Sequence, residues 1–341
     1  MRSATWNPSD RFTTTEILWD EAPPPARLRV TRDHSRTILA KNNSRDIPFT
    51  WSVNPYRGCT HACAYCYARD FHPYLGLGAG TDFEQEIRIK PDAPALLRAA
   101  FERPSWTGEA IALSGVTDPY QPLERRHRLT RGVLEVCAEY RNPVGVITRS
   151  PLVTRDLDLL SQLAETDGVR VNISLPILDL TLCRQIEPGA PAPARRLDAI
   201  RALADAGIPV GVSVSPVIPG LNDASIPATL AAARSAGARW AWRLPVRLAA
   251  TVEQVFERRL RAALPLRADA VMNRIRRMRG GGPLSGGPPG ERMQGQGAAW
   301  AATAALFDLH ARKLGFERVP DRPPRSAFRR PGRGQQVSLF G

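Results

Sequence analysis

Three cysteines with short, regular spacing are the residues of this chain best suited to chemistry. Cys59, Cys63 and Cys66 stand in a C-x3-C-x2-C arrangement, with a tyrosine on each side of the last one. Thiolates at this spacing can each bind one iron of a cubane cluster, which normally takes four cysteines. The spacing therefore predicts a [4Fe-4S] cluster that these three residues ligate, with one iron left open to bind a small molecule.

Zinc is the alternative metal for the same three cysteines. Cys137, Cys183 or His61 would then supply a fourth ligand. Short zinc motifs usually pair one C-x2-C with a second such pair, and this chain has no second pair. Disulfides are not expected, because the number of cysteines is five, an odd number, and no secretory signal is evident.

The run from Asn54 to Tyr67 resembles the cluster motif of the radical S-adenosylmethionine (SAM) enzymes, and its ending, Cys-Ala-Tyr-Cys-Tyr, resembles the spore photoproduct lyase branch, which repairs a thymine lesion in DNA. The likeness covers roughly residues 50–245. It implies that SAM binds the open iron and that an electron from the cluster cleaves SAM to a 5′-deoxyadenosyl radical, which abstracts hydrogen from the substrate. It also implies an electron donor such as flavodoxin or ferredoxin.

Polar residues near the ends of predicted strands are the candidate SAM contacts. They are Ser114, Thr117, Arg149, Ser174, Arg196 and Asn222. The glycine and hydroxyls at 114–117 would let the backbone approach the SAM amino group, although the same letters also suit an ordinary turn. Arg149 is suited to binding a carboxylate through two hydrogen bonds. Arg196 follows Glu187 in an element that resembles the lyase branch, which implies a contact to the SAM carboxylate; a solvated arginine at a helix start is the alternative. Asn222 would contact the adenine edge or cap the next helix.

Two residues are candidates for hydrogen transfer, Tyr67 and Cys183. In the resembled branch, aromatics beside the last cluster cysteine pack near the cluster or relay hydrogen atoms, whereas shielding of the cluster from water is the alternative for Tyr65 and Tyr67. The lyase returns hydrogen from a cysteine near its second strand, and residues 112–118 contain none. Cys137 is expected in the core, which leaves Cys183 as the thiol that can reach the site.

Alternating strand and helix patterns follow residue 50. Strands are expected at 51–57, 110–116, 144–148, 169–175, 209–215 and 239–244, and helices at 92–102, 130–140, 154–165, 194–206 and 223–236. This alternation predicts a parallel α/β unit with right-handed connections. Six strands fit a partial (β/α)6 TIM-like barrel of the radical SAM type, with the chemistry at the carboxyl ends of the strands.

The flanking segments differ from this core in composition. We expect an irregular, partly disordered N-terminal extension at 1–49, a core barrel at 50–250, a C-terminal helical region at 251–317 and a disordered basic tail at 318–341. The N-terminus shows no signal peptide, and no apolar run approaches the ~20 residues of a membrane span. We therefore expect a cytoplasmic protein with no membrane partner.

The charge of the chain favours a polyanionic partner. The formal net charge is +14, and residues 255–280 and 310–334 each hold eight basic residues against two acidic ones. Clustered charge of this kind favours contacts to the phosphates of nucleic acid, DNA rather than RNA in our interpretation. The alternative is an arginine-rich composition that only raises solubility.

The end of the chain carries a short peptide of its own. Gln336-Val337-Ser338-Leu339-Phe340 resembles the peptide by which bacterial replication and repair proteins bind the sliding clamp, and it follows a basic segment expected to be flexible. The alternative is a terminal strand or an apolar plug on the barrel. A clamp-binding peptide would bring the enzyme to newly replicated or repaired DNA.

Three functions are therefore compatible with the sequence. The first is a radical SAM enzyme that abstracts hydrogen from a nucleic-acid substrate, with repair of a DNA lesion as one such reaction. The second is radical SAM modification of RNA or of a protein. The third is a zinc-stabilised module that binds nucleic acid without catalysis.

Overall fold

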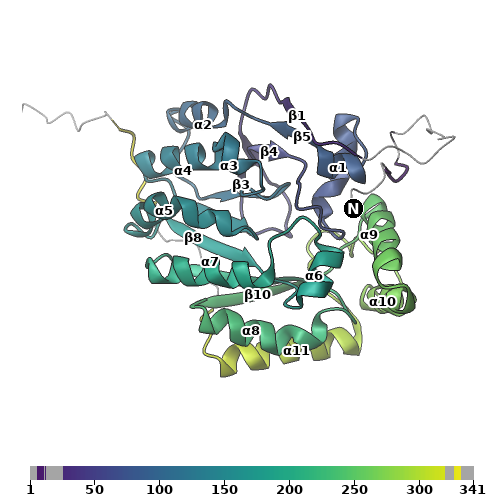
Figure 1. Ribbon diagram of the computed structural model, residues 1–341. Coiled ribbons are helices and arrows are strands. Elements are labelled where there is room, and N and C mark those ends of the chain that lie inside the picture. Colours follow the sequence, from purple (N-terminus) through teal and green to yellow (C-terminus); the bar gives the residue numbers. More distant parts are fainter. Residues whose placement is uncertain (1–5, 11, 13–25, 319–325, 332–341) are drawn as a thin grey trace, which may run out of the picture.

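A mostly parallel sheet forms the centre of the computed structural model, which describes residues 6–10, 12, 26–318 and 326–331 (Figure 1). Within these residues the sheet has seven strands in the order β10-β9-β8-β7-β6-β3-β2. The strands are β2 (Leu39–Lys41), β3 (Trp51–Val53), β6 (Ile111–Leu113), β7 (Val144–Thr148), β8 (Val169–Ser174), β9 (Val210–Val217) and β10 (Trp240–Pro245). The six strands from β3 to β10 pair in parallel, and β2 pairs antiparallel with β3 at the edge. The expected α/β fold with six parallel strands is confirmed.

Helices connect the parallel strands and cover the sheet. They are α2 (Ala93–Phe101), α3 (Glu124–His127), α4 (Leu129–Tyr140), α5 (Leu157–Ala164), α6 (Leu180–Ile186), α7 (Pro193–Asp205) and α8 (Ile226–Ser235), with the 3₁₀ segments η3 (Pro151–Asp156) and η4 (Asp223–Ser225) ahead of α5 and α8. Figure 1 shows α4, α5, α7 and α8 in a row over one face of the sheet. Their apolar residues at helical spacing, such as Leu160 and Leu163, are buried against the strands. All five expected helices are present, and α3 and α6 are additional ones.

A second, small sheet lies beside the first and includes part of the N-terminal extension. Its order is β1-β5-β4, from β1 (Arg29–Arg32), β5 (Glu86–Ile89) and β4 (Tyr56–Arg57). The segment between β4 and β5 also contains η1 (Tyr67–Phe71), η2 (Pro73–Leu75) and α1 (Thr81–Gln85). The expectation of an irregular extension is therefore wrong for 29–32 and 39–41, which pair with strands of the core. The strand expected at 51–57 is divided into β3 and β4.

The C-terminal helices pack against the loop that carries the three cysteines. They are α9 (Ala250–Ala263), α10 (Pro265–Met278) and α11 (Gly297–Lys313). The buried faces of α9 and α10, with Phe256 and Met272 among them, form one apolar cluster with Cys63, Tyr65 and Ile186. The arginines of these helices thus lie on a layer whose inner face covers the cysteine loop.

Part of the basic tail is ordered, which corrects the expectation of disorder from residue 318 onward. Phe328 packs against Phe101 and Tyr140, with ring centroids 5.8 and 6.1 Å apart. Arg330 donates hydrogen bonds to the carbonyls of Phe101, Arg103 and Trp106. The peptide at 336–340 lies outside the described residues. Nowhere in the described part of the chain does a helix combine the length and apolar character of a bilayer-spanning segment.

Candidate active site

The three cysteines lie on one loop between β4 and η1, at the carboxyl side of the first parallel strand. Cys59 and Cys63 are buried and Cys66 is partly exposed. Backbone hydrogen bonds tie this loop to two other segments: Cys59 N donates to Phe83 O (2.9 Å), and Ala64 N donates to Ile186 O (2.9 Å). The loop is therefore positioned by α1 on one side and by α6 on the other.

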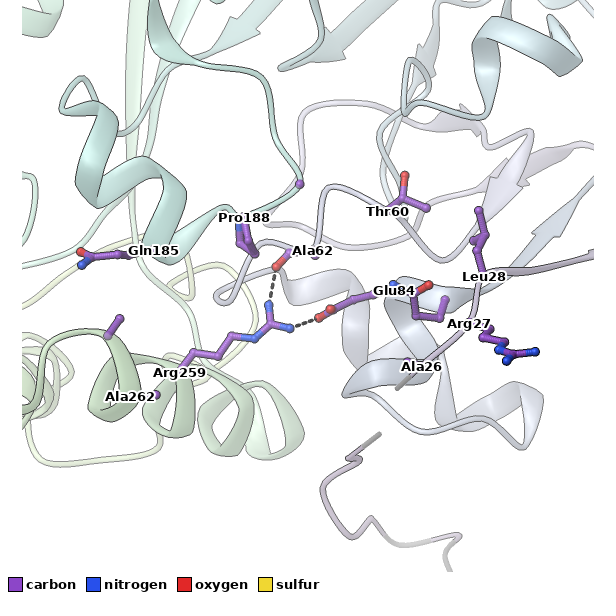
Figure 2. A pocket seen from close by; sticks show the side chains of 13 residues that line it. Ala26, Arg27, Leu28, Thr60, Ala62, Glu84, Gln185, Pro188, Arg259 and Ala262 are labelled. Atoms are coloured by element: carbon purple, nitrogen blue, oxygen red, sulfur yellow. Dashed lines mark hydrogen bonds and ion pairs between the residues drawn. The ribbon is translucent and has the colours of Figure 1, made fainter. Parts of the chain in front are cut away.

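Two arginines bind the cysteine loop through its carbonyl groups. Arg69, fully buried, donates to Cys63 O through two nitrogens (3.1 and 2.9 Å) and forms an ion pair with Glu84. Arg259 of α9 donates to Ala62 O and pairs with the same carboxylate. Figure 2 shows Arg259 reaching between Ala62 and Glu84 at a cavity of about 860 Å³, whose wall includes the loop backbone at Thr60 and Ala62. The surface thus comes close to the cysteine loop on this side.

The donor set of this loop fits an iron–sulfur cluster. All five cysteines are free thiols in this structure. Arg149 Nη1 lies 3.0 Å from Cys63 Sγ, so a cation is in place to stabilise the thiolate that binds iron. Burial raises the pKa of Cys63, and the charge of Arg149 opposes that rise. Among the described residues no three His, Cys, Asp or Glu side chains are arranged to hold a single metal ion.

A buried carboxylate joins three of the predicted site residues. Glu187, fully buried, pairs with Arg149 (2.8 Å) and with Arg196, and it accepts a hydrogen bond from Tyr65. Cys183 Sγ lies 3.5 Å from the same carboxylate and 3.4 Å from Arg196 Nη2. Burial would raise the pKa of Glu187, but Arg196 and Arg149 outweigh it and lower the pKa to about 2. Glu187 is therefore ionised, and it holds both guanidinium groups beside the cysteine loop.

A second buried carboxylate lies near the first cysteine. Asp118 Oδ2 is 3.4 Å from His61 Nδ1, and Asp118 also accepts hydrogen bonds from Thr148 Oγ1 (2.6 Å) and Arg149 N (2.9 Å). Burial lowers the pKa of His61, but Cys59 and Asp118 outweigh it and raise the pKa to about 9. The imidazolium in turn favours the thiolate: burial raises the pKa of Cys59, and the charge of His61 brings it below its ordinary value.

The candidate SAM contacts lie at the carboxyl ends of neighbouring strands, as the parallel sheet requires. Ser114 follows β6 with a positive φ of 135° and donates to Thr117 O (3.1 Å). Thr117 is buried, with its hydroxyl 3.5 Å from Tyr56 O. The hydroxyl of Ser174, at the end of β8, makes no hydrogen bond within the described residues. These three residues remain predicted contacts.

Two of the candidate contacts have their donors bound within the protein. Arg196 is fully buried and bonds to Pro191 O, Ser174 O and Glu187, so the alternative of a solvated arginine is wrong. Asn222 donates to Pro176 O (2.7 Å) and Pro216 O (2.9 Å) and accepts from Ile218 N (2.7 Å). Its side chain does not cap η4, which corrects the capping alternative. Both side chains therefore bind backbone groups at or just after the ends of β8 and β9.

The two hydrogen-transfer candidates lie in different surroundings. Tyr67 is 50% exposed, and its phenol donates to Gly115 O (2.5 Å), which links the cysteine loop to the end of β6. Cys183 is 1% exposed and faces Glu187 and Arg196. Burial and then the charge of Glu187 raise its pKa to about 11. Tyr67 is thus accessible at the strand ends, whereas Cys183 lies behind the buried ion pair.

Sequence reasoning missed the roles of several buried charged residues. Arg69 binds the backbone of the cysteine loop and pairs with Glu84. No motif in the sequence around either residue distinguishes it from a charged residue at the surface. Asp118 precedes a proline, and Asp-Pro is a common turn dipeptide, so its sequence context does not indicate a buried role. Glu187 offered one signal, since a lone acid between apolar Ile186 and Pro188 suggests a paired carboxylate.

Comparisons with known proteins agree with this geometry. A family model described as the radical SAM superfamily matches residues 53–233. An uncharacterised protein of Mycobacterium tuberculosis is 42% identical over 181 residues, which cover 53% of each chain. A radical SAM Nα-GlyT isomerase of Pseudomonas phage M6 is 28% identical over 171 residues, which cover 50% of this chain and 33% of the isomerase. The chain thus spans about half the length of the curated relatives it matches first.

Solved structures of spore photoproduct lyase share the fold at low sequence identity. A point mutant of that lyase has a TM-score of 0.57 at 15% identity, covering 84% of this chain and 80% of the lyase. A lyase complexed with dinucleoside spore photoproduct has a TM-score of 0.51 at 17% identity, covering 69% and 67%. With the family model covering more than half of its residues and the three-cysteine loop at the strand ends, this chain belongs to the radical SAM superfamily.

Proposed function

We propose that this protein abstracts hydrogen from a damaged or modified nucleotide in DNA, using a [4Fe-4S] cluster and SAM. The superfamily implies both groups. The single observation that carries the proposal is the loop of Cys59, Cys63 and Cys66, held at the carboxyl ends of the parallel strands beside Arg149. When bound there, the cluster and SAM would supply the one-electron cleavage that yields a 5′-deoxyadenosyl radical.

The residues of the chain have separate tasks in this proposal. Cys59, Cys63 and Cys66 hold the cluster, and Arg149, Ser114, Thr117 and Ser174 bind SAM at the strand ends. Arg196 and Asn222 act through other residues: Arg196 fixes Glu187, and Asn222 fixes the loop after β9. Tyr67 takes part in hydrogen transfer, because its ring is accessible next to Cys66. Cys183 would need an opening behind Glu187 and Arg196 to do the same.

Charge and similarity support a nucleic-acid substrate. The net charge of +14 favours a polyanion. Arg258, Arg274, Arg276 and Arg277 are exposed on α9 and α10. The lyase with the same fold was solved with a dinucleoside photoproduct, and the phage relative is named for an Nα-GlyT isomerase reaction. Lesion repair is one reaction that suits these observations, and radical modification of RNA or a protein is the outcome that a negative DNA assay would favour.

Two protein partners belong to the same proposal. An electron donor such as flavodoxin or ferredoxin would reduce the cluster, and the cavity beside Thr60 and Ala62 brings the surface near the cysteine loop. The bacterial sliding clamp would bind Gln336–Phe340. A pull-down on the clamp should retain the full chain and lose a chain that ends at Arg333; equal retention of both would exclude the peptide.

Anaerobic reconstitution tests the chemistry directly. With iron, sulfide, dithionite and SAM, the protein should produce 5′-deoxyadenosine, and Cys63→Ala should produce none. Cys137→Ala is the matched control, because Cys137 is buried in α4 away from the loop. Adding lesion-containing DNA deuterated at the base should transfer deuterium to 5′-deoxyadenosine. Full SAM cleavage by Cys63→Ala would refute the cluster assignment, and the absence of transfer from any DNA substrate would refute the choice of substrate.

A further inference from the structure

Three arginines gather where the last parallel strand meets the glycine-rich loop at 280–296. Arg247 lies between β10 and α9, Arg279 follows α10, and Arg292 belongs to the loop. Neighbouring backbone contacts fix Arg247: Val246 N donates to Val217 O (2.9 Å), and Leu248 N donates to Leu284 O (2.9 Å). The cluster is therefore built into the fold at the carboxyl ends of the parallel strands, the end of the sheet at which the cysteine loop also lies.

Carboxylates compensate this positive charge only in part. Asp46 accepts from the backbone of Gly290 (2.8 Å) and Arg292 (3.3 Å), and its carboxylate lies 3.9 Å from Arg292 Nη1. Arg279 is bonded to carbonyl groups, among them Gln294 O and Val246 O. Arg247 donates to Ser285 O (2.7 Å) and forms no ion pair within the described residues. Burial lowers the pKa of Arg247, repulsion from Arg292 lowers it further, and Asp46 and Asp70 oppose the shift.

This cluster lies near the accessible side of the candidate active site. The hydroxyl of Thr251, four residues after Arg247, donates to Asp70, three residues after Tyr67, so the start of α9 lies against the segment that follows the cysteine loop. The side chain of Arg292 is 38% exposed. Arg149, a candidate SAM contact, lies instead against the cysteine loop, 3.0 Å from Cys63 Sγ. Arg247, like Arg292, is partly exposed, so a ligand from solvent can reach both of their guanidinium groups.

We propose that Arg247 and Arg292 bind a backbone phosphate of the nucleic-acid substrate beside Tyr67. This inference rests on the proposed function and adds the position of the substrate strand. A phosphodiester meets the requirement of the site because it brings one diffuse negative charge to two guanidinium groups. Arg279 keeps the glycine-rich loop in place through its carbonyl contacts, and Asp46 orients Arg292. A base next to that phosphate would then lie near the Tyr67 ring.

Fluorescence anisotropy with a labelled single-stranded oligodeoxynucleotide tests this assignment on the reconstituted full chain. Losing the neutralisation of one phosphate reduces the slope of log affinity against log salt by about 0.7, so Arg247→Ala/Arg292→Ala should show that loss and Arg247→Ala a part of it. Arg247→Lys keeps the charge and should keep the slope. Arg103→Ala removes an exposed arginine at the opposite edge of the sheet and is the matched control.

Two further readouts separate the failure of this inference from that of the proposed function. Iron content should equal that of wild type in every variant, which checks folding, and equilibrium dialysis should show an unchanged affinity of Arg247→Ala for SAM. If Arg247→Ala has the same salt slope as the Arg103→Ala control, the inference is overturned and the proposed function is not. A loss of SAM binding by Arg247→Ala would also overturn it, because Arg247 would then bind the SAM carboxylate. If the wild type binds no oligonucleotide, both the DNA substrate and this phosphate site are refuted.

Discussion

At the scale of single residues, the site depends on charges that are buried in pairs. Glu187 forms ion pairs with the guanidinium groups of Arg149 and Arg196 in the protein interior. Removing one partner of a buried ion pair costs far more than the pair contributes, because it leaves an uncompensated charge. Glu187→Gln should therefore lower the free energy of unfolding by about 3–5 kcal/mol in urea denaturation at neutral pH.

An exposed ion pair provides the matched control for that substitution. Glu139 pairs with Arg98 on the surface, with side-chain exposures of 38% and 46%. Glu139→Gln should change the free energy of unfolding by about 1 kcal/mol or less. Equal losses in the two variants would show that the buried carboxylate has no special structural role.

The same carboxylate should make stability depend on pH in the acid range. The folded pKa of Glu187 is about 2, below the ordinary value of 4.5, so its stabilisation is present above pH 4.5 and is lost as the pH falls through about 2. The loss amounts to about 3 kcal/mol. The difference in unfolding free energy between wild type and Glu187→Gln, measured on metal-free protein, should shrink across this interval; a constant difference would contradict the assignment.

At the scale of elements, close packing between two loops positions the cysteines. A Cβ on Gly189, in the loop after α6, would lie 2.1 Å from Thr60 O, and Gly189 N already donates to His61 O (3.0 Å). Gly189→Ala should therefore displace the cysteine loop and lower the iron content after anaerobic reconstitution. Gly145→Ala in β7, where nothing lies within 4 Å of the new Cβ, should load iron as wild type does. Full iron content in both variants would show that the contact is dispensable.

The tail segment at residues 326–331 is a second element, and its contribution to the free energy of unfolding can be measured. Phe328 is half-buried against Phe101 and Tyr140, so Phe328→Ala should lower the free energy of unfolding by about 1–2 kcal/mol. Arg329→Ala is the control, because the residue is exposed and its backbone bond to Tyr140 O survives the change. Thermal unfolding of the two variants compares them. No difference between them would mean that the tail contact adds nothing to stability.

The hydrophobic pattern of the sequence predicted the parallel strands of the large sheet well, but it did not predict the short strands outside them. Of the six parallel strands, β6, β7, β8 and β9 are rich in buried apolar residues, a pattern that can be detected in a single sequence. β1 (Arg29–Arg32) is exposed along its whole length, and backbone pairing with β5 forms it, so it has no apolar pattern to read. The split of 51–57 depends on Asn54, whose side chain accepts from Val116 N, a contact between distant residues.

The same distinction holds for the candidate site. The spacing of the three cysteines is local and was readable from the sequence, and the family model supports its interpretation. The partners of Arg149 were not readable, because Cys63, Glu187 and Asp118 come from three separate loops. Arginines on α9 and α10 looked uniform in the sequence, yet Arg259 and Arg279 are bonded inside the protein while others are exposed.

At the scale of the whole molecule, the arginines of α9 and α10 fall into two groups, one that holds the cysteine loop in place and one that is free to bind nucleic acid. Arg276 and Arg277 are exposed on α10, whereas Arg259 binds Ala62 O and Glu84 next to the cluster cysteines. If nucleic acid lies on the outer face of these helices, Arg276→Ala/Arg277→Ala should reduce the salt slope for single-stranded DNA by about 1.4 and leave iron content unchanged. Arg259→Ala should lower iron content, because the cysteine loop loses one of the two arginines that bind its carbonyl groups. Anisotropy titrations and iron analysis on both variants test this division, and a loss of iron without a change in slope in the double variant would contradict it.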